Sequence, residues 1–323
     1  MIQRSFGYRL AIRLLQFAIG ILALVAIPVA VIFLLAPHSP RMASAALYIA
    51  RAAVFATSLP GRDKHCSIGD AWTVSRGELF QNRDRIFAAS RIAATDGRFV
   101  LADTPAGKFW IPAPDYDNLA AELAEQQEEV YGHDVLHPGD VVLDCGANVG
   151  VYTRVALAHG ARIVVAIDLA PEPIECLRRN FESEIREGRV IVYPKGVWDK
   201  DATLRLHTSA KIASAGDSVV LDRGGLGPEV PLTTIDKLVA ELKLPRVDVI
   251  KMDIEGSEAP ALTGAAHTLA AYKPRLAISM EHKQSDPDVI PALVGRLNPQ
   301  YQMRCTECGN TTGRIQPEVL LAW

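Results

Sequence analysis

The feature that most constrains the fold is an apolar run that leads directly into a glycine-rich turn. The segment at 141–150 reads VVLDCGANVG, with a carboxylate between the apolar run and the turn. From His137 onward, short apolar runs alternate with helical segments, and this alternation is typical of a parallel sheet with crossover helices. We therefore expect a doubly wound, Rossmann-like α/β domain over residues 136–323.

The spacing of the glycines argues against a dinucleotide. A dinucleotide fingerprint has glycines at the first, third and sixth positions of the turn. Counted from Gly146, the third and sixth positions are Asn148 and Val151. This spacing disfavours an oxidoreductase. A turn that carries Asp144 instead favours a positively charged ligand, because a carboxylate attracts an ammonium group.

A second carboxylate strengthens this hypothesis. The expected strand at 163–167 ends at Asp168, and an acid at this place in related folds accepts hydrogen bonds from both hydroxyls of a ribose. Together the two acids suit a nucleoside with a positively charged tail. The candidate ligand-binding residues are Asp144, Gly146, Ala147, Asn148, Gly150 and Asp168. Trp198 follows the third expected strand, and it is either a neighbour of the base or a core aromatic.

Five short strings resemble the FkbM-type methyltransferases in order and spacing. They are DCGANVG at 144–150, GVWD at 196–199, TID at 234–236, KMDIEGSE at 251–258 and LTGA at 262–265. The resemblance covers the chain from about Phe99 to its end. It implies the seven-stranded methyltransferase fold, S-adenosylmethionine as cofactor, and methylation of hydroxyls on sugars or polyketides. Asp168 departs from the family, which usually has Glu at this position.

Methyl transfer to a hydroxyl requires alignment of the acceptor oxygen and a base for its proton. Asp253, after the fourth expected strand, is the candidate for binding the cofactor and positioning the acceptor. Glu281 and His282, after the fifth, are the candidate acid/base pair. Asp253 and Glu255 could also cap the helix that follows, and His282 could be structural. No third ligand for a divalent cation is evident, so we predict no metal site.

A long apolar segment precedes this domain. Residues 14–36 read LLQFAIGILALVAIPVAVIFLLA and carry no charge. A helix of this length crosses a bilayer core of ~30 Å, so we expect an N-terminal transmembrane anchor rather than a signal peptide. A second apolar helix over about 42–59 is expected to be re-entrant, interfacial, hairpin-forming or simply packed. The predicted anchor region is 1–60, and a connector with an accessory region occupies 61–135.

Two sequence signals disagree about the side of the membrane on which the catalytic domain lies. Arg4, Arg9 and Arg13 precede the apolar segment and weakly favour a cytoplasmic N-terminus, so that a single crossing would place the enzyme outside. S-adenosylmethionine, however, is made in the cytoplasm. The five cysteines form no regular framework, the CxxC of Cys305 and Cys308 included, and they fit a reducing space. We expect the catalytic domain on the cytoplasmic side of a bacterial inner membrane.

The charge balance limits the partners. The chain has 34 basic and 37 acidic residues, spread along its length, so no nucleic-acid partner is expected. The expected acceptor is a small molecule, a glycan or a lipid-linked saccharide, and a membrane protein or a second copy is a further possible partner. A competing hypothesis is a noncatalytic methyltransferase-like membrane scaffold. The joint presence of Asp144, Asp168 and Asp253 argues against it.

Overall fold

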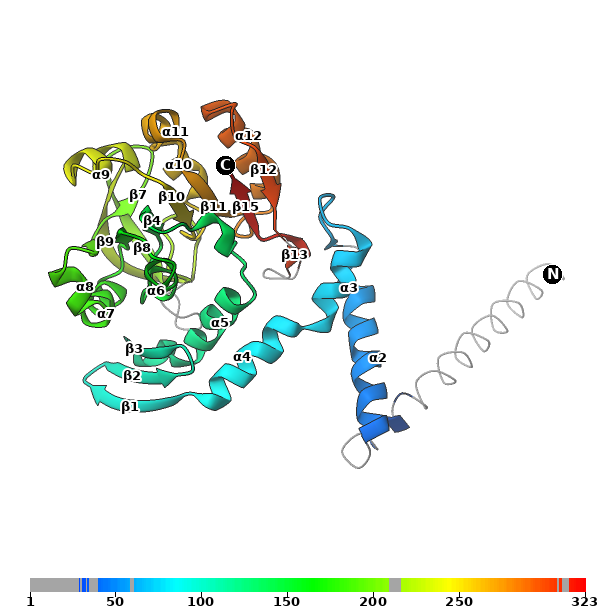
Figure 1. Cartoon of the computed structure of the whole chain (residues 1–323). Coiled ribbons are helices and arrows are strands. Elements are labelled where there is room, and N and C mark those ends of the chain that lie inside the picture. Colours follow the sequence, from blue (N-terminus) through cyan, green and yellow to red (C-terminus); the bar gives the residue numbers. More distant parts are fainter. Residues whose placement is uncertain are drawn as a thin grey trace, which may run out of the picture.

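The computed structural model describes residues 29, 31–32, 34, 40–58, 61–208, 216–306, 308–309 and 314–323. Its centre is a seven-stranded sheet in the order β12-β15-β11-β10-β4-β5-β6 (Figure 1). These strands are β4 (Val141–Cys145), β5 (Ile163–Ile167), β6 (Val190–Tyr193), β10 (Val249–Met252), β11 (Arg275–Ser279), β12 (Met303–Cys305) and β15 (Val319–Ala322). The first five run parallel, whereas β15 is antiparallel to both of its neighbours. The seven-stranded α/β fold expected from the sequence is confirmed.

Helices cover both faces of this sheet, because alternate residues of its strands point to opposite sides. Leu143 and Ile250 belong to a core shared with the helices that follow β9 and β10, while Val142 and Val249 pack with Tyr152 on the other face. The helices are α6 (Val151–Ala158), α7 (Pro171–Asn180), α8 (Glu182–Arg186), α9 (Ile235–Glu241), α10 (Glu258–Thr263), α11 (Ala266–Tyr272) and α12 (Asp286–Leu297).

The strand order reverses between β4 and β10, and ligands of open α/β sheets bind at such a switch point. Gly146 lies there, directly after β4. Its φ is +77°, and a Cβ at this position would meet the carbonyl oxygen of Asp253 at 1.8 Å. Only glycine therefore permits this close approach of the two strand ends.

Two smaller sheets flank the central one. The antiparallel sheet β1 (Arg91–Asp96), β2 (Phe99–Thr104) and β3 (Gly107–Pro112) packs against α5 (Tyr116–Gln127). The other consists of β7 (Gly196–Val197), β9 (Gly225–Thr233) and β8 (Ala202–Thr208), and a short pair joins β13 (Cys308–Gly309) to β14 (Gln316–Pro317). Two short strands around a turn at 103–107 and a helix over 118–131 are expected from the sequence, and they correspond to β2, β3 and α5, whereas β1 is not expected.

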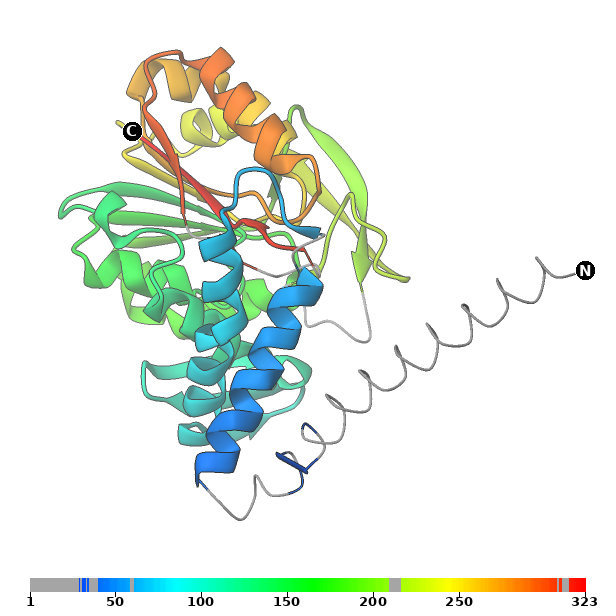
Figure 2. The ribbon, with the colours of Figure 1, turned by 90° about the vertical axis from the view of Figure 1, so that its right-hand side faces the viewer.

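In the described part of the chain from residue 40 onward, the helices α2 (Pro40–Ser58), α3 (Ile68–Arg76) and α4 (Glu78–Ala89) precede these elements. Both overall views show α2 and α3 side by side at the edge of the α/β domain (Figures 1 and 2), and Tyr48 meets Trp72 edge-on, with ring centres 6.0 Å apart. The mixed charge and weak periodicity of residues 62–90 predict a connector or an irregular subdomain, but this region is largely helical, with a turn at Gly77, where φ is +64°. The second apolar helix expected near 42–59 is α2.

The predicted transmembrane helix at 14–36 lies almost wholly outside the described residues, and it stays a prediction. Within the part of the chain that is described, no helix combines the length and the apolar character needed to cross a bilayer. The proposed division at residues 60 and 135 likewise stays a prediction.

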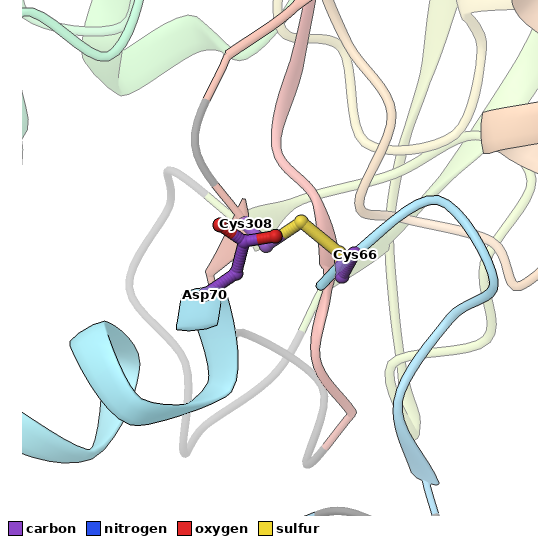
Figure 3. A group of neighbouring side chains, drawn as sticks. All are labelled: Cys66, Asp70 and Cys308. Carbon is purple, nitrogen blue, oxygen red and sulfur yellow. A yellow bond between two sulfur atoms is a disulfide. The ribbon is translucent and has the colours of Figure 1, made fainter. Parts of the chain in front are cut away.

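A disulfide links the two ends of the described chain. Cys66, just before α3, is bonded to Cys308 in β13, 242 residues later in sequence (Figure 3). Asp70 lies beside the bridge and caps α3, since its carboxylate accepts from the backbone N–H of Ser67. The expectation of five unpaired cysteines is therefore wrong for this pair. Of the other three, Cys145 and Cys176 are buried thiols and Cys305 is an exposed one.

Candidate functional site

A cavity of about 270 Å³ lies at the carboxyl ends of the parallel strands, at the switch point of the sheet. Seven carboxylates are among its lining residues: Glu122, Glu125, Asp168, Asp217, Asp253, Glu255 and Glu281. Among the described residues that line it, there is no Lys, Arg or His. Such a cavity attracts a cation and repels phosphate groups, which agrees with the glycine spacing in disfavouring a dinucleotide.

Asp168 lines this cavity directly after β5, as the sequence predicted for a ribose ligand. Its two carboxylate oxygens accept hydrogen bonds from the backbone N–H groups of Asn148 and Ala170, each at 2.9 Å. Burial raises its pKa despite these bonds. Asp168 thus holds the glycine turn and borders the ligand space.

Asn148 also lines the cavity and turns its side chain toward α5. Its backbone has a positive φ of 46°, and its Nδ2 donates to Glu122 Oε1 at 2.6 Å. The Oδ1 atom of the same side chain is buried without a hydrogen-bond partner. Gly146 and Asn148 are therefore the members of the predicted turn that face the ligand space.

Asp144 is placed differently from our expectation. Its side chain is fully buried, and it is absent from the cavity lining. One carboxylate oxygen lies 3.3 Å from Lys251 Nζ, and the other accepts from Thr153 Oγ1 at 2.6 Å. The prediction that Asp144 attracts the ammonium of a ligand is wrong in this structure, because Lys251 already neutralises the carboxylate.

Ala147 and Gly150 also do not line the cavity. Ala147 is buried in a cluster with Leu177 and Phe181. Gly150 begins α6 with a φ of +92°, and a Cβ there would meet the Phe181 ring at 2.2 Å. Both residues affect the site indirectly, because their packing sets the shape of the turn.

Trp198 lies outside the cavity as well. It packs beside Ala170 and Leu206, and its backbone N–H donates to the Thr233 carbonyl at 2.7 Å. The preceding residues of the same string, Gly196 and Val197, line the cavity instead. The alternative of a core aromatic is the better description of Trp198.

Helix α5 contributes two acids that the sequence did not single out. Glu122 and Glu125 lie three residues apart on one face of the helix, over the cavity. Burial raises the pKa of Glu122 to about 8, because the Lys251 ammonium offsets only part of the effect. Burial, together with the negative charges of Asp253 and Glu281, raises the pKa of Glu125 well above its ordinary value.

Asp253, after β10, lines the cavity and accepts a hydrogen bond from Tyr131 Oη at 2.7 Å. Burial opposes its ionisation, but the positive charges of Lys251 and His282 outweigh this and lower the pKa of Asp253. It therefore presents a charged carboxylate to the ligand space. Glu281, after β11, lines the same cavity, so the structure brings these two predicted site residues together.

His282 lies behind them, within a ring of carboxylates. Its Nε2 is 3.4 Å from Asp253 Oδ1 and 3.5 Å from Glu255 Oε1, and its Nδ1 is 3.0 Å from Glu258 Oε1. Burial disfavours the charged ring, but Glu258 and Glu255 outweigh it and raise the pKa of His282 well above its ordinary value. His282 also does not line the cavity, so Glu281 is the better placed of the two predicted acid/base residues.

The ligand atoms of Asp253, Glu258 and His282 lie within 4.8 Å of one another, close enough to hold a metal ion. Each side chain is already engaged, however. Glu258 accepts from the backbone N–H of Ile254 at 3.0 Å, and His282 supplies the positive charge among these acids. Glu258 and His282 thus provide, beside Asp253, the further ligands that were not evident from the sequence, and the same side chains form an ion-pair network.

A second cavity, of about 740 Å³, lies between α3 and α4 on one side and the C-terminal strands on the other. It shares Ala121 and Glu125 with the first, so α5 forms a wall common to both. Cys308 of the disulfide also lines it, as does the half-exposed ring of Phe80.

Comparison with known proteins identifies the family. Residues 144–305, half of the chain, match the family described as the methyltransferase FkbM domain. The chain belongs to the FkbM methyltransferase family. Membership implies S-adenosylmethionine as the cofactor and a methyltransferase activity that depends on it.

Individual relatives of this FkbM-family chain are distant. The 31-O-demethyl-FK506 methyltransferase FkbM of Streptomyces tacrolimicus is 27% identical over 40% of this chain and 60% of its own length. The AMB antimetabolite synthetase AmbE of Pseudomonas aeruginosa is 26% identical over 49% of this chain and 9% of its own length. The chain thus spans less than two thirds of either curated relative.

Among solved structures, a methyltransferase FkbM from Methylobacillus flagellatus has a TM-score of 0.44 at 18% identity, covering 78% of this chain and 60% of its own. A Streptococcus mutans protein described as a methyltransferase, in complex with SAH, has a TM-score of 0.39 at 14% identity, covering 61% and 95%.

The residues of the FkbM-family site suit the charge and polarity of this cofactor. A sulfonium and an ammonium would enter a cavity lined by seven carboxylates and by no described cationic side chain. The Ser257 hydroxyl and Asn148 Oδ1 are buried without hydrogen-bond partners, and both residues line the cavity. Asp168, Asn148, Gly146 and Gly196 are the residues that would hold the nucleoside.

Proposed function

We propose that the protein is a membrane-anchored, S-adenosylmethionine-dependent O-methyltransferase that acts on a hydroxyl of a glycan, a lipid-linked saccharide or a related metabolite. The observation that carries this proposal is the carboxylate-lined cavity at the switch point, with Asp253 and Glu281 at its wall. The cofactor supplies an activated methyl group on a positively charged sulfur.

Two residues of this chain would act on the acceptor. The Asp253 carboxylate, kept ionised and hydrogen-bonded to Tyr131, positions the hydroxyl by accepting its hydrogen bond. Glu281 is the candidate base that takes the proton as the oxygen becomes methylated. His282 is a positioning residue, because its charged ring orients Asp253 and Glu255 from behind.

The second cavity is the route by which we propose that the acceptor reaches this centre. It meets the first cavity at Glu125, and its outer wall is formed by α3 and α4, which follow α2 and the predicted anchor. Its volume lies within the usual range of sites for small organic ligands, roughly 300–1,000 Å³. An acceptor in or beside a bilayer would approach from that side.

The test is methyl transfer from isotopically labelled S-adenosylmethionine by the full-length protein in lipid nanodiscs, with a membrane lipid and glycan extract as acceptor. Label in a glycan or lipid fraction, as an alkali-stable ether, supports the proposal. Cofactor binding without transfer to any fraction would favour the noncatalytic scaffold, and alkali-labile label would point to carboxyl methylation instead.

We also propose that the catalytic domain faces the cytoplasm, where the cofactor is made. The Cys66–Cys308 bridge weighs against this placement, since disulfides persist mainly in oxidising compartments. Reporter fusions after Trp323 decide the question: a cytoplasm-dependent reporter should be active and an alkaline phosphatase inactive. The opposite pattern, with both cysteines protected from thiol alkylation in intact cells, would place the domain outside.

A further inference from the structure

Helix α5 places two half-buried acids, Glu122 and Glu125, at the cofactor cavity, and neither of them forms a salt bridge with any described residue. Glu122 and Glu125 line the cofactor cavity on one face of α5, and Asp253 and Glu281 line it from the ends of β10 and β11. Both glutamates are held in a buried setting that disfavours their charge. Two neighbouring carboxylates on one helix face do not both ionise cheaply unless a positive charge joins them.

The charged and polar groups around the two glutamates come from several elements. Lys251 of β10 and Asp253 after it act on Glu122, and Asn118 of α5 and Asn148 of the glycine turn donate hydrogen bonds to it. The largest charge effects on Glu125 come from acids: Asp253, Glu281, Glu122 and Glu318, the last of which precedes β15.

Lys251 does not pair with Glu122 or Glu125. Its ammonium lies 3.3 Å from Asp144 Oδ1 and donates to the Gly146 carbonyl at 2.9 Å, behind the glycine turn. The pair is buried, with 5% or less of either side chain exposed. Lys251 is therefore engaged by Asp144 and by the turn, and it forms no salt bridge with Glu122 or Glu125.

A separate observation points to a ligand at the same wall. The hydroxyl of Ser257, a residue only 3% exposed, lines the cavity without a hydrogen-bond partner. A buried hydroxyl of this kind costs free energy unless a ligand or water satisfies it. The acids and this hydroxyl therefore belong to one polar surface that a bound molecule completes.

We propose that Glu122 and Glu125 select the cofactor by its positive charge, releasing a proton to solvent when the sulfonium enters the cavity. This inference rests on the proposed function, because it assumes S-adenosylmethionine as the cofactor. Each carboxylic acid that ionises gives up one proton and becomes the counter-charge of the cofactor. The demethylated product is a neutral thioether, so the acids take the proton back and the product is held less tightly.

The experiment is calorimetry on the full-length protein in nanodiscs, between pH 6 and 9, in two buffers of different ionisation enthalpy. Three ligands are compared: S-adenosylmethionine, S-adenosylhomocysteine, and sinefungin, which carries an ammonium in place of the methylated sulfur. All three have the same amino-acid tail, so differences between them report the charge at the sulfur position.

We expect the two cationic ligands to release about one proton more at pH 7 than S-adenosylhomocysteine does. Their affinity relative to S-adenosylhomocysteine should rise between pH 6 and 8, by up to about tenfold per pH unit, and level off above the pKa of Glu122. Glu122→Gln and Glu125→Gln should each reduce the rise. Glu128→Gln, at the C-cap of the same helix and lining only the second cavity, is the matched control and should keep the rise.

Equal proton release for all three ligands in the wild type would overturn the charge selection, while leaving the cofactor and the reaction intact. Failure of every nucleoside to bind would overturn the proposed function as well. If a glutamine variant does not fold, the proton count of the wild type decides alone.

Discussion

Lys251 lies opposite Asp144 in the register of β10 and β4, and its ammonium is 3.3 Å from the carboxylate. Lys251 also donates a hydrogen bond to the carbonyl of Gly146, so the ion pair stabilises the first residue of the turn. The carboxylate of the glycine-turn motif therefore serves the backbone of the turn, and the acids that meet the ligand come from elsewhere in the fold.

Asp168→Ala should weaken S-adenosylmethionine binding by about ten- to a hundred-fold. The change removes the carboxylate at the cavity wall and frees the backbone N–H groups of Asn148 and Ala170, about the loss of one or two charge-assisted hydrogen bonds. Calorimetry on a variant with a normal melting temperature measures it. Unchanged affinity would move the ribose site away from Asp168.

Glu281→Gln should lower turnover by about 100- to 10,000-fold and change cofactor affinity little. Proton transfer to a positioned base typically contributes that much, and glutamine keeps the size of the side chain without its basicity. Initial rates with a saturating acceptor, set beside calorimetric affinities, make the comparison. A variant with wild-type turnover would require a different base, and Asp253 would be examined next.

His282→Gln should destabilise the fold by about 3–5 kcal/mol near pH 6, because three acids lose their buried cation. The pKa of His282 is raised in the folded state, so its contribution is fully present below the unfolded pKa of about 6.5. The contribution then declines as the pH rises toward the folded pKa. Urea unfolding of both proteins at pH 6, 7.5 and 9 measures the difference, and a gap that widens with pH would contradict the assignment.

Gly150→Ala should cost on the order of 1–3 kcal/mol more than Gly139→Ala. Both glycines have a positive φ, +92° and +87°, so alanine is strained at either position. A Cβ at 150 also meets the Phe181 ring at 2.2 Å, whereas nothing lies within 4 Å at 139. Chemical denaturation of the two variants isolates the contact, and equal losses would show that backbone strain alone matters.

Cys308→Ala should lower the free energy of unfolding by about 2–5 kcal/mol, since the disulfide closes a long loop in the unfolded chain. Cys305→Ala, three residues away and exposed, should leave stability nearly unchanged. Denaturation with and without a reducing agent provides the measurement. If reduction affects neither the wild type nor the variants, the bridge is absent in solution.

The central fold could be predicted because its signals are local. The apolar runs that became β4, β5 and β10 are bounded by glycine or acid residues, and Thr234, a residue type that favours helix caps, caps α9 through the N–H of Lys237. The helices α3 and α4 were missed because their mixed charges left no clear period.

The site was harder to predict from the sequence, because its charges are paired across the sheet. The sequence shows Asp144 in the turn motif, but not that the register of β10 sets Lys251 beside it. Glu122 and Glu125 lie in a stretch rich in Ala, Glu and Gln, which is typical of a solvated helix. It is the packing of α5 over the strand ends that directs the helix face with these two residues toward the cavity. Their i,i+3 spacing was the one local signal.

The Cys66–Cys308 bridge also affects how a force applied at the N-terminal side of the domain is transmitted to the rest of it. Without the bridge, a pull on α2 would pass through α3 and α4 to β1, and so to the outer rim of the molecule. With it, part of the tension passes from Cys66 across one covalent bond to β13, next to the wall of the second cavity. The ring that the bridge closes, residues 66–308, contains the residues that line the cofactor cavity, so a pull on α2 reaches this ring at both of its ends.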